Sequence, residues 1–427
     1  MTLKLNLNIK LTLILAFVVL SIFRSPYIFT EGRFMAEDGE LYFKSAFEKN
    51  FLEHIIYFPA NAGYYNFIAN LLSEISNYFP IYKAPLVVAY GSLFFIILPI
   101  ILILFKNSYL FKKDLQKIVA CFLFFITTPN APEIWANSIN SQIYLFMCSF
   151  LILYFKYEDN FVRFFEKFVL LIAGLSGIYS CILTPLFFIK FYLKKTKNNF
   201  YNFLILFFCT LIQSSLIFYS KINNLLYARK LDLAGEPIFY FKAFIYSFFA
   251  KPIFGRELLL YLDSLFFDLF KNSYFLIIFF LLIIISIFFL IRVNFIDFLK
   301  KDKILQSLIL IYFLVLAVIF IGSDNFPPSG RYAAIPGLLF LISLYYIGTN
   351  IHNRYFKNFL NFLIILSILV GTYEFRPNSK YIKFLDCINC PEWKNEVIKW
   401  KSNSEYSIKI WPYHRKAFHL NKKHEVN

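Results

Sequence analysis

The chain has 427 residues, of which 59% are hydrophobic, 22% aromatic and only 16% charged. Soluble domains carry about 25% charged residues, so the composition excludes an ordinary soluble fold and predicts an all-α polytopic membrane protein. The formal net charge of +17 does not indicate a nucleic-acid partner, because the basic residues flank apolar segments instead of forming one face.

Apolar segments follow one another along the chain and predict about ten to eleven transmembrane helices. They lie at 11–29, 84–105, 118–129, 139–155, 168–193, 200–219, 274–292, 304–322, 333–349 and 359–373. No small-residue cleavage site follows the first segment, so we expect it to remain as a signal anchor. The long segment 168–193 is interrupted around Gly174 and Gly177, which predicts a hairpin of two short helices that returns to its starting side.

The distribution of basic residues predicts the orientation in the membrane. With a cytoplasmic N terminus, the inward loops are rich in Lys and Arg, whereas the two short outward loops, near 130–138 and 323–331, carry only Arg331. This asymmetry follows the positive-inside rule and supports the hairpin. Three longer pieces, 30–83, 220–273 and 374–427, then lie outside. The last is basic, but long tails translocate largely regardless of their charge.

The first outward loop, 30–83, carries two amphipathic patterns that predict interfacial helices. The first pattern covers 40–58 and the second ends before Pro80, with a break at 59–63 between them. The apolar stripes comprise Phe43, Phe47, Phe51 and Ile55 in the first helix and Phe67, Leu71 and Ile75 in the second. Such helices either shape a site between lipid and water or simply anchor the loop, and both interpretations stay open.

An acidic run at 36–40 precedes these helices and contains Glu37, Asp38 and Glu40. One interpretation is structural: Asp38 before Gly39 is typical of a helix N-cap, with Glu40 in the first turn. The other is catalytic: a carboxylate near a low-dielectric surface has a raised pKa and suits a general base.

Arg331 is a candidate for binding an anionic group, and Arg33 is a second arginine close to the acidic run. Arg33 precedes the acidic run, and Arg331 with Tyr332 follows a loop shaped by Pro and Gly. An arginine at the membrane surface binds a lipid-linked phosphate through paired N–H donors. The alternative is an interface anchor, or for Arg331 an ion pair with Asp324.

The loop 129–142 places Trp135 among several amides, including Asn137, Asn140 and Gln142. An indole that stacks on a sugar, beside amides that bond its hydroxyls, would form a carbohydrate surface. The favoured alternative is a tryptophan of the interfacial belt, with Asn137 or Ser138 as a helix cap.

The segment 220–273 has no tight metal-ligand spacing and predicts further interfacial helices. The tail 374–427 differs in composition from the membrane domain 1–373 and predicts a small α+β module, with a helix at 392–400 and a strand at 406–412. In the tail, Cys387 and Cys390 favour a local disulfide or free thiols over half of a zinc site with His414 or His419.

This outline resembles the GT-C superfamily of membrane glycosyltransferases, in its poorly characterised bacterial branch. The resemblance rests on Glu37-Asp38-Gly39, the Gly63-Tyr64 turn, Asn137 to Gln142, Gly330-Arg331-Tyr332 and Ile410-Trp411-Pro412. It implies transfer of a sugar from a polyprenyl-phosphate carrier at the plasma membrane, with Asp38 or Glu37 acting on the acceptor.

The resemblance implies a substrate site made of Arg331, Tyr332, Glu40, Arg33, Tyr64, Asn137, Asn140 and Gln142. Some members use a divalent metal such as Mg or Mn, but no second acidic motif is visible here, so we expect metal independence. Two other functions compete with the transferase. One is a transporter or flippase for a polysaccharide precursor, and the other is a membrane subunit of an envelope-assembly machine.

Overall fold

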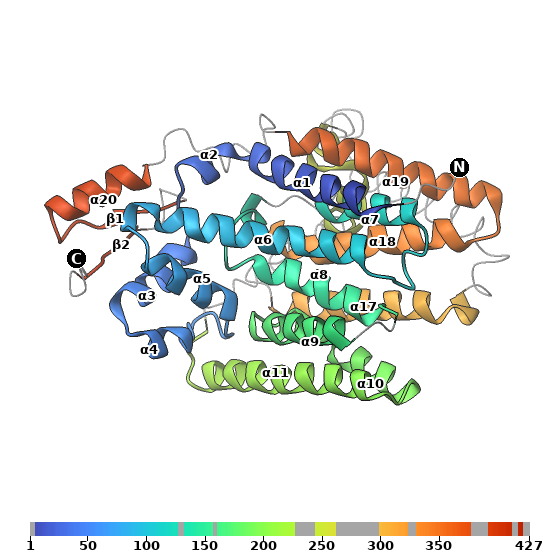
Figure 1. The fold of residues 1–427 in the computed structure, drawn as a ribbon, viewed down its shortest axis with the longest axis horizontal. Helices are drawn as coiled ribbons and strands as arrows, with labels where there is room; N and C mark the ends of the chain where they lie inside the picture. The colour runs from blue at the N-terminus through green and yellow to red at the C-terminus, as the bar shows by residue number, and fades with distance from the viewer. Residues whose placement is uncertain are drawn as a thin grey trace, which may run out of the picture. The chain divides into compact units, whose positions relative to one another are not determined.

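The computed structural model describes residues 5–126, 132–156, 160–226, 244–261, 299–322, 330–376, 392–411 and 417–421 (Figure 1). These residues are mostly helical and belong to two compact units. The first unit comprises Met1–Lys117, Pro132–Tyr227 and Pro377–Asn427, and the second comprises Ile118–Ala131 and Ala228–Arg376. The tail therefore belongs to the same unit as the first predicted outward loop.

The helices of the first unit come from three separate segments of the chain. They are α1 (Leu7–Arg24), α2 (Pro26–Thr30), η1 (Asp38–Phe43), α3 (Lys44–Glu48), α4 (Phe51–Ile55), α5 (Phe67–Asn77), η2 (Ile81–Lys83), α6 (Ala84–Phe105), η3 (Pro132–Ile134), α8 (Ser141–Leu153), α9 (Asn160–Leu175), η4 (Ser180–Leu183), α10 (Thr184–Leu193), α11 (Lys197–Ile222) and α20 (Trp393–Ser402). The strands β1 (Ile408–Lys409) and β2 (Ala417–Phe418) complete this unit. Helix α7 (Asp114–Phe125) contains the boundary between the units.

The second unit contains η5 (Tyr246–Ala250), α13 (Lys251–Phe254), α17 (Lys303–Gly322), η6 (Gly330–Ala333), α18 (Ala334–Asn350) and α19 (Arg354–Phe375). Helix α18 packs against α17 and α19, and α13 packs against α18 and α19. Of the predicted interfacial segment 220–273, the described part at 244–261 is largely helical.

Six of the helices in the described ranges are long and apolar enough to cross a membrane. They include α1, α6, α11, α17 and α19, together with the stretch that contains η6 and α18. This confirms an all-α membrane protein. The predicted segments 118–129 and 139–155 form the shorter helices α7 and α8, and the predicted span 274–292 lies outside the described residues.

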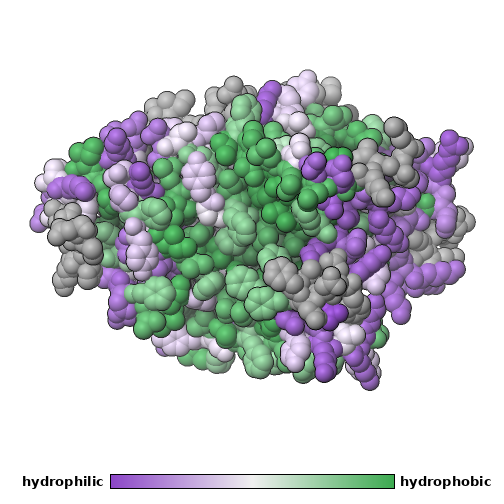
Figure 2. Space-filling model, in the orientation of Figure 1, coloured by the Kyte–Doolittle hydropathy of each residue, from purple (hydrophilic) through white to green (hydrophobic). Residues whose placement is uncertain are grey.

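Helix α8 forms the centre of the first unit, because all of its residues are buried. Helices α6 and α9 pack against it, and α1 packs against α6. Pro85 suits the first turn of α6, where a backbone N–H is not needed. Figure 2 shows apolar side chains over the face where α1 and α6 run, and hydrophilic ones at the end that carries α20.

The predicted hairpin at 168–193 is confirmed. Helix α9 ends at Leu175, and α10 begins at Thr184 after the short η4 turn. On α10, the Lys190 ammonium donates to the carbonyl oxygen of Leu153 at 2.7 Å. Leu153 is the last residue of α8 and lies shortly before α9 in the chain, so α10 returns to the side where α9 begins.

The prediction of one helix over 40–58 is wrong. The chain forms η1 and α3, then leaves the helical conformation at Lys49 (φ −108°, ψ 166°). The side chain of Asn50 accepts a hydrogen bond from the Glu53 N–H at 2.9 Å and starts α4. Asparagine is a strong N-cap residue, so this bond starts a new helix and the predicted single helix is divided in two.

The second predicted helix of this loop is confirmed as α5. Its buried side chains include the apolar Ile68, Ala69 and Leu72 as well as the polar Asn70, Ser73 and Glu74. Of the predicted apolar stripe, Ile75 is 39% exposed, whereas Phe67 and Leu71 are half-buried.

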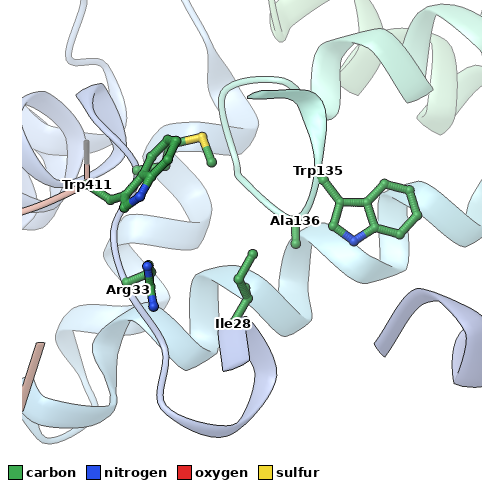
Figure 3. A pocket seen from close by; sticks show the side chains of 6 residues that line it. Ile28, Arg33, Trp135, Ala136 and Trp411 are labelled. Atoms are coloured by element: carbon green, nitrogen blue, oxygen red, sulfur yellow. The ribbon is translucent and has the colours of Figure 1, made fainter. Parts of the chain in front are cut away.

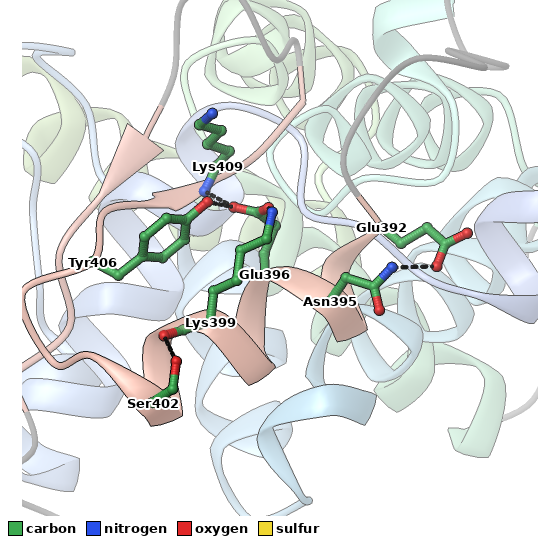
Figure 4. Close-up of polar contacts among 7 residues, drawn as sticks. All are labelled: Glu392, Asn395, Glu396, Lys399, Ser402, Tyr406 and Lys409. Atoms are coloured by element: carbon green, nitrogen blue, oxygen red, sulfur yellow. Dashed lines mark hydrogen bonds and ion pairs between the residues drawn. The ribbon is translucent and has the colours of Figure 1, made fainter.

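The described part of the tail, which we call the C-terminal module (392–411 and 417–421), combines α20 with an antiparallel pair of β1 and β2. The carboxylate of Glu396 on α20 is fully buried. It accepts hydrogen bonds from the Lys399 ammonium (2.8 Å), the Tyr406 hydroxyl (2.7 Å) and the Lys409 N–H (3.0 Å) (Figure 4). These bonds join the helix to β1.

Glu396→Gln is expected to destabilise the C-terminal module by about 1–2 kcal/mol, because it replaces charge-assisted bonds with neutral ones. Burial by itself would raise the pKa of Glu396, but the bonds from Lys399, Tyr406 and Lys409 outweigh it and lower the pKa below the ordinary 4.5. The stabilisation is therefore present above pH 4.5 and is lost as the pH falls below it.

Thermal unfolding of the full chain, followed by tryptophan fluorescence between pH 3 and 7, measures this effect. Three of the four tryptophans, Trp393, Trp400 and Trp411, lie in the C-terminal module. Glu392→Gln is the matched control, because Glu392 is exposed and its carboxylate accepts a hydrogen bond from the exposed Asn395 side chain (Figure 4). Equal losses of stability for Glu396→Gln and Glu392→Gln would contradict the stabilising role of Glu396.

Candidate active site

Asp38 is the first residue of η1 and is only 1% exposed. Its Oδ1 atom accepts hydrogen bonds from the Ser138 hydroxyl at 2.5 Å and from the Ile139 N–H at 3.3 Å. Because no side-chain bond caps η1, the N-cap interpretation of Asp38 is wrong. The carboxylate bonds instead to a loop one hundred residues further along the chain.

Burial raises the pKa of Asp38 to about 7, although the bonds from Ser138 and Ile139 lower it in part. The negative charge of the neighbouring Glu37 adds to the increase. A carboxyl group with a pKa near the working pH is suited to exchange a proton as a general base. The raised pKa predicted for the acidic run is therefore present at one member, Asp38.

The loop before α8 presents the two donors to Asp38. Its amide side chains bond within the loop: Asn137 Oδ1 accepts from the Asn140 N–H at 2.9 Å, and Asn140 Nδ2 donates to the Glu133 carbonyl at 2.7 Å. Asn137 Nδ2 also donates to the Glu133 carbonyl. The predicted cap at Asn137 or Ser138 is wrong, because the N-cap residue of α8 is Asn140 and it makes no side-chain cap bond. Both amides instead hold the loop that carries Ser138.

Two alanines next to these contacts have a left-handed backbone, Ala36 with φ of 43° and Ala136 with φ of 50°. Non-glycine residues with positive φ are uncommon and strained, and such strain concentrates at functional sites. Ala36 lies two residues before Asp38, and Ala136 lies two residues before Ser138. Asp38 and Ser138, which share the 2.5 Å hydrogen bond, therefore each lie two residues after an alanine with a strained backbone.

The C-terminal module holds the segment that leads to Asp38. The Ala36 N–H donates to the Trp411 carbonyl at 2.6 Å, and the Trp411 N–H donates to the Phe34 carbonyl at 3.3 Å. Trp393 of the same module packs edge-on against Phe34 and donates its indole N–H to the Ile81 carbonyl at 2.8 Å. Hydrogen bonds from the C-terminal module thus hold the strained backbone of Ala36 in place.

A small hollow lies beside this segment, with a volume of about 270 Å³ that includes solvent at its mouth. It is lined by Ile28, Arg33, Met35, Trp135, Ala136 and Trp411 (Figure 3). Arg33 lies over the ring of Tyr27, 4.1 Å from its centre. The hollow thus combines one arginine with two tryptophans, and its lining residues come from three distant parts of the chain.

Trp135 is not a residue of the interfacial belt. It is 2% exposed, and the guanidinium of Arg24 lies 4.2 Å from its ring centre. Arg24 is itself 1% exposed at the end of α1. Arg24 was not among the predicted site residues, although an ionisable residue inside an apolar segment, here 11–29, is a signal of function. With Arg24 over this ring and the residue buried, the predicted sugar-stacking role of Trp135 is not supported.

Tyr64 and Gln142 lie together, because Gln142 Nε2 approaches the Tyr64 hydroxyl at 3.4 Å. Tyr42, one turn after Asp38, is buried, and its pKa is raised by burial and further by the charges of Tyr64, Tyr57 and Asp38. Tyr64 and Gln142 therefore belong to a polar cluster that includes Tyr42 and adjoins Asp38.

The remaining predicted site residues are either half-buried or in contact with a neighbour in the sequence. Glu37 and Glu40 flank Asp38 and are half-buried. In the second unit, Arg331 lies over the ring of Tyr332, 5.2 Å from its centre, and Nη2 approaches the Tyr332 hydroxyl at 3.4 Å. The meeting of Arg331 with Asp38 stays a prediction. Asp324, Cys387, Cys390 and His414 lie outside the described residues.

No group of three or more His, Cys, Asp or Glu side chains gathers to hold a metal ion in the part of the chain that the structure describes. The described contacts of Asp38 come from a hydroxyl and a backbone N–H, not from a second carboxylate. A carboxylate held by these two donors is suited to exchange a proton.

Comparisons with known proteins returned no matching family model, no matching curated protein and no matching solved structure.

Proposed function

We propose that this protein is a membrane glycosyltransferase that moves a sugar from a polyprenyl-phosphate-linked donor to an acceptor outside the bacterial plasma membrane. The finer architecture belongs to the same proposal: about ten to eleven transmembrane helices, a cytoplasmic N terminus and an outward α+β tail. The observation that carries it is the buried Asp38, with a pKa raised to about 7 and a bond from Ser138.

In the proposed reaction, an acceptor hydroxyl attacks the anomeric carbon of the donor sugar. Asp38 accepts the hydroxyl proton as the new carbon–oxygen bond forms. The bond between the anomeric carbon and the phosphate oxygen breaks, and the lipid phosphate leaves with the electron pair. Direct displacement inverts the anomeric configuration. Because Asp38 is almost completely covered, the acceptor reaches it only after an opening step.

Glycan and glycolipid profiling of a deletion strain tests the proposed function. The expected result is loss of one sugar from an envelope glycan and accumulation of its lipid-linked donor, both reversed by the wild-type gene. Unchanged glycans and donor pools would contradict the proposal. Movement of an intact lipid carrier across vesicles containing the protein, with no transfer, would favour the transporter alternative.

Ser138→Ala is expected to shift the acid limb of the pH–activity profile upward by about 0.5–1 pH unit. The Ser138 bond lowers the pKa of Asp38, so its loss leaves the carboxyl protonated to a higher pH and the base inactive there. Transfer in membranes between pH 5.5 and 8.5 measures the shift.

The matched control is Ser149→Ala, because Ser149 is also buried but donates to the Leu145 carbonyl on α8. An unshifted profile for Ser138→Ala, or the same shift in both variants, would rule out this role for the bond.

A further inference from the structure

We infer that the first unit carries a binding site for the headgroup of an anionic phospholipid, formed by Lys156 and Lys194 beside the ring of Tyr109. The three residues lie just beyond the last residues of α8, α10 and α6. In Figure 1 these helices end on the side of the unit opposite α20. Because α20 belongs to the module that holds the segment before Asp38, the site is separate from the candidate active site and does not depend on the proposed transfer.

A short backbone pairing fixes the position of Tyr109. Its N–H donates to the Tyr154 carbonyl at 3.0 Å, and the Lys156 N–H donates to the Asn107 carbonyl at 3.0 Å. The loop after α6 is therefore joined to the residues that follow α8. Tyr109 is half-buried, and the pairing places its ring next to Lys156, which comes from a later segment of the chain.

Two lysine side chains converge on this ring. The Lys156 Nζ atom lies 5.6 Å from the ring centre of Tyr109, and the Lys194 Nζ atom lies 4.9 Å from the same centre. A cation is attracted to the face of an aromatic ring, so the ring holds both ammonium groups near each other. Like charges repel, and an anion that contacts both groups offsets this repulsion.

The positive charge at this site is not neutralised by the described residues around it. In the part of the chain that the structure describes, neither ammonium group forms an ion pair. Both lysines are exposed, so a ligand can reach them. The segments 106–117, 154–167 and 190–197, which supply these residues, contain eleven basic and four acidic residues, with no acidic residue in the segment around Lys194. The surrounding charge therefore favours an anionic ligand.

The surroundings favour a phospholipid over a soluble anion. Helix α6 is long and apolar enough to cross a membrane, and α8 and α10 belong to shorter apolar helices. Tyr192 and Leu193, directly before Lys194, are exposed. Exposed aromatic and apolar side chains beside lysines at the ends of such helices are typical of the membrane surface, where clusters of basic residues bind anionic headgroups. The acyl chains then lie along α10, and the ammonium groups contact the phosphate as point charges.

Native mass spectrometry of the purified full chain, titrated with dioleoyl phosphatidylglycerol, measures the Kd of the first bound lipid. Dioleoyl phosphatidylcholine has the same acyl chains and no net charge, and inorganic phosphate as a competitor separates a lipid headgroup from a free anion. Lys156→Gln combined with Lys194→Gln is expected to raise the Kd for phosphatidylglycerol by about tenfold or more, because each lysine near an anionic headgroup contributes to the affinity.

Lys301→Gln combined with Lys303→Gln is the matched control, because these lysines are also exposed and lie at the start of α17 in the second unit. It removes the same charge outside the site, so the Kd is expected to stay within about twofold of the wild type. Tyr109→Leu is expected to raise the Kd by about twofold to fivefold, because the ring no longer holds the ammonium groups. Tyr109→Phe keeps the ring and is expected to bind as the wild type does.

The site is overturned if the Lys156 and Lys194 double variant binds phosphatidylglycerol as the wild type does, or if phosphatidylcholine binds as tightly. Equal losses of affinity in the two double variants would also reject it, because they would reflect general surface charge. Displacement of the lipid by an equal concentration of inorganic phosphate would reject a lipid ligand. Should the double variant fail to fold, Lys194→Gln decides the matter, with a raised Kd supporting the site and an unchanged Kd rejecting it.

Discussion

Asp38→Asn is expected to reduce sugar transfer by about a hundredfold to ten-thousandfold, the contribution of a general base. Asparagine has the same shape, and its oxygen still accepts from the Ser138 hydroxyl and the Ile139 N–H, which bond to Asp38 in the wild type. It has no basic oxygen that can take a proton at neutral pH. The loss is therefore chemical, and transfer assays in membranes with equal protein levels measure it.

Stability distinguishes this loss from misfolding. The folded protein raises the pKa of Asp38 from 3.8 to about 7, so ionised Asp38 destabilises the folded state increasingly as the pH rises through this range. Asp38→Asn removes that charge, and its melting temperature at pH 8 is expected to equal or exceed that of the wild type.

Glu37→Gln tests the neighbouring carboxylate of the acidic run, which is half-buried. Glu31→Gln is the matched control, because Glu31 is a nearby exposed carboxylate; it is expected to keep transfer within about threefold of the wild type, well short of the loss of a general base. If Asp38→Asn and Glu37→Gln both leave transfer unchanged, the acidic run is not catalytic. If only Glu37→Gln abolishes transfer, the base is Glu37.

Gly39→Val is expected to separate the C-terminal module from the acidic run and to lower stability by about 1–3 kcal/mol, the usual cost of overpacking. A Cβ atom at Gly39 would lie 3.0 Å from Phe34 Cβ, 3.2 Å from Ile410 Cδ1 and 3.2 Å from Phe418 Cε1. Ile410 and Phe418 belong to the module. A larger side chain therefore displaces them, and with them the neighbouring Trp411.

Limited proteolysis and hydrogen exchange of residues 392–421 measure this displacement. Gly39→Ala is expected to show a smaller effect in the same direction. Gly322→Val is the matched control, because a Cβ atom at Gly322 meets nothing within 4 Å. If Gly39→Val leaves exchange in the module unchanged while Gly322→Val increases it, the proposed docking of the module on Gly39 is wrong.

Much of the helical structure followed from local patterns. The apolar run 84–105 coincides with α6, and the interruption at 174–177 marks the turn between α9 and the η4–α10 segment. These features depend on the length of apolar segments and the spacing of apolar residues. Both are set directly by the membrane environment and the helix period. The end of α3 at Lys49 and the start of α4 after Asn50 were not predicted. Apolar residues at four-residue spacing favoured one continuous helix over the N-cap signal of Asn50.

Composition and apolar segment length are sufficient to identify a helical membrane protein with an acidic run after its first apolar segment. The burial of Asp38 depends on folding, because Ser138 and Ile139 contact it from a loop that no local pattern connects to it. Folding also brings Trp411 from the tail to Ala36. Contacts between such distant residues depend on how the helices pack. Helix packing produces no periodic pattern in the sequence, so local sequence patterns cannot predict these contacts.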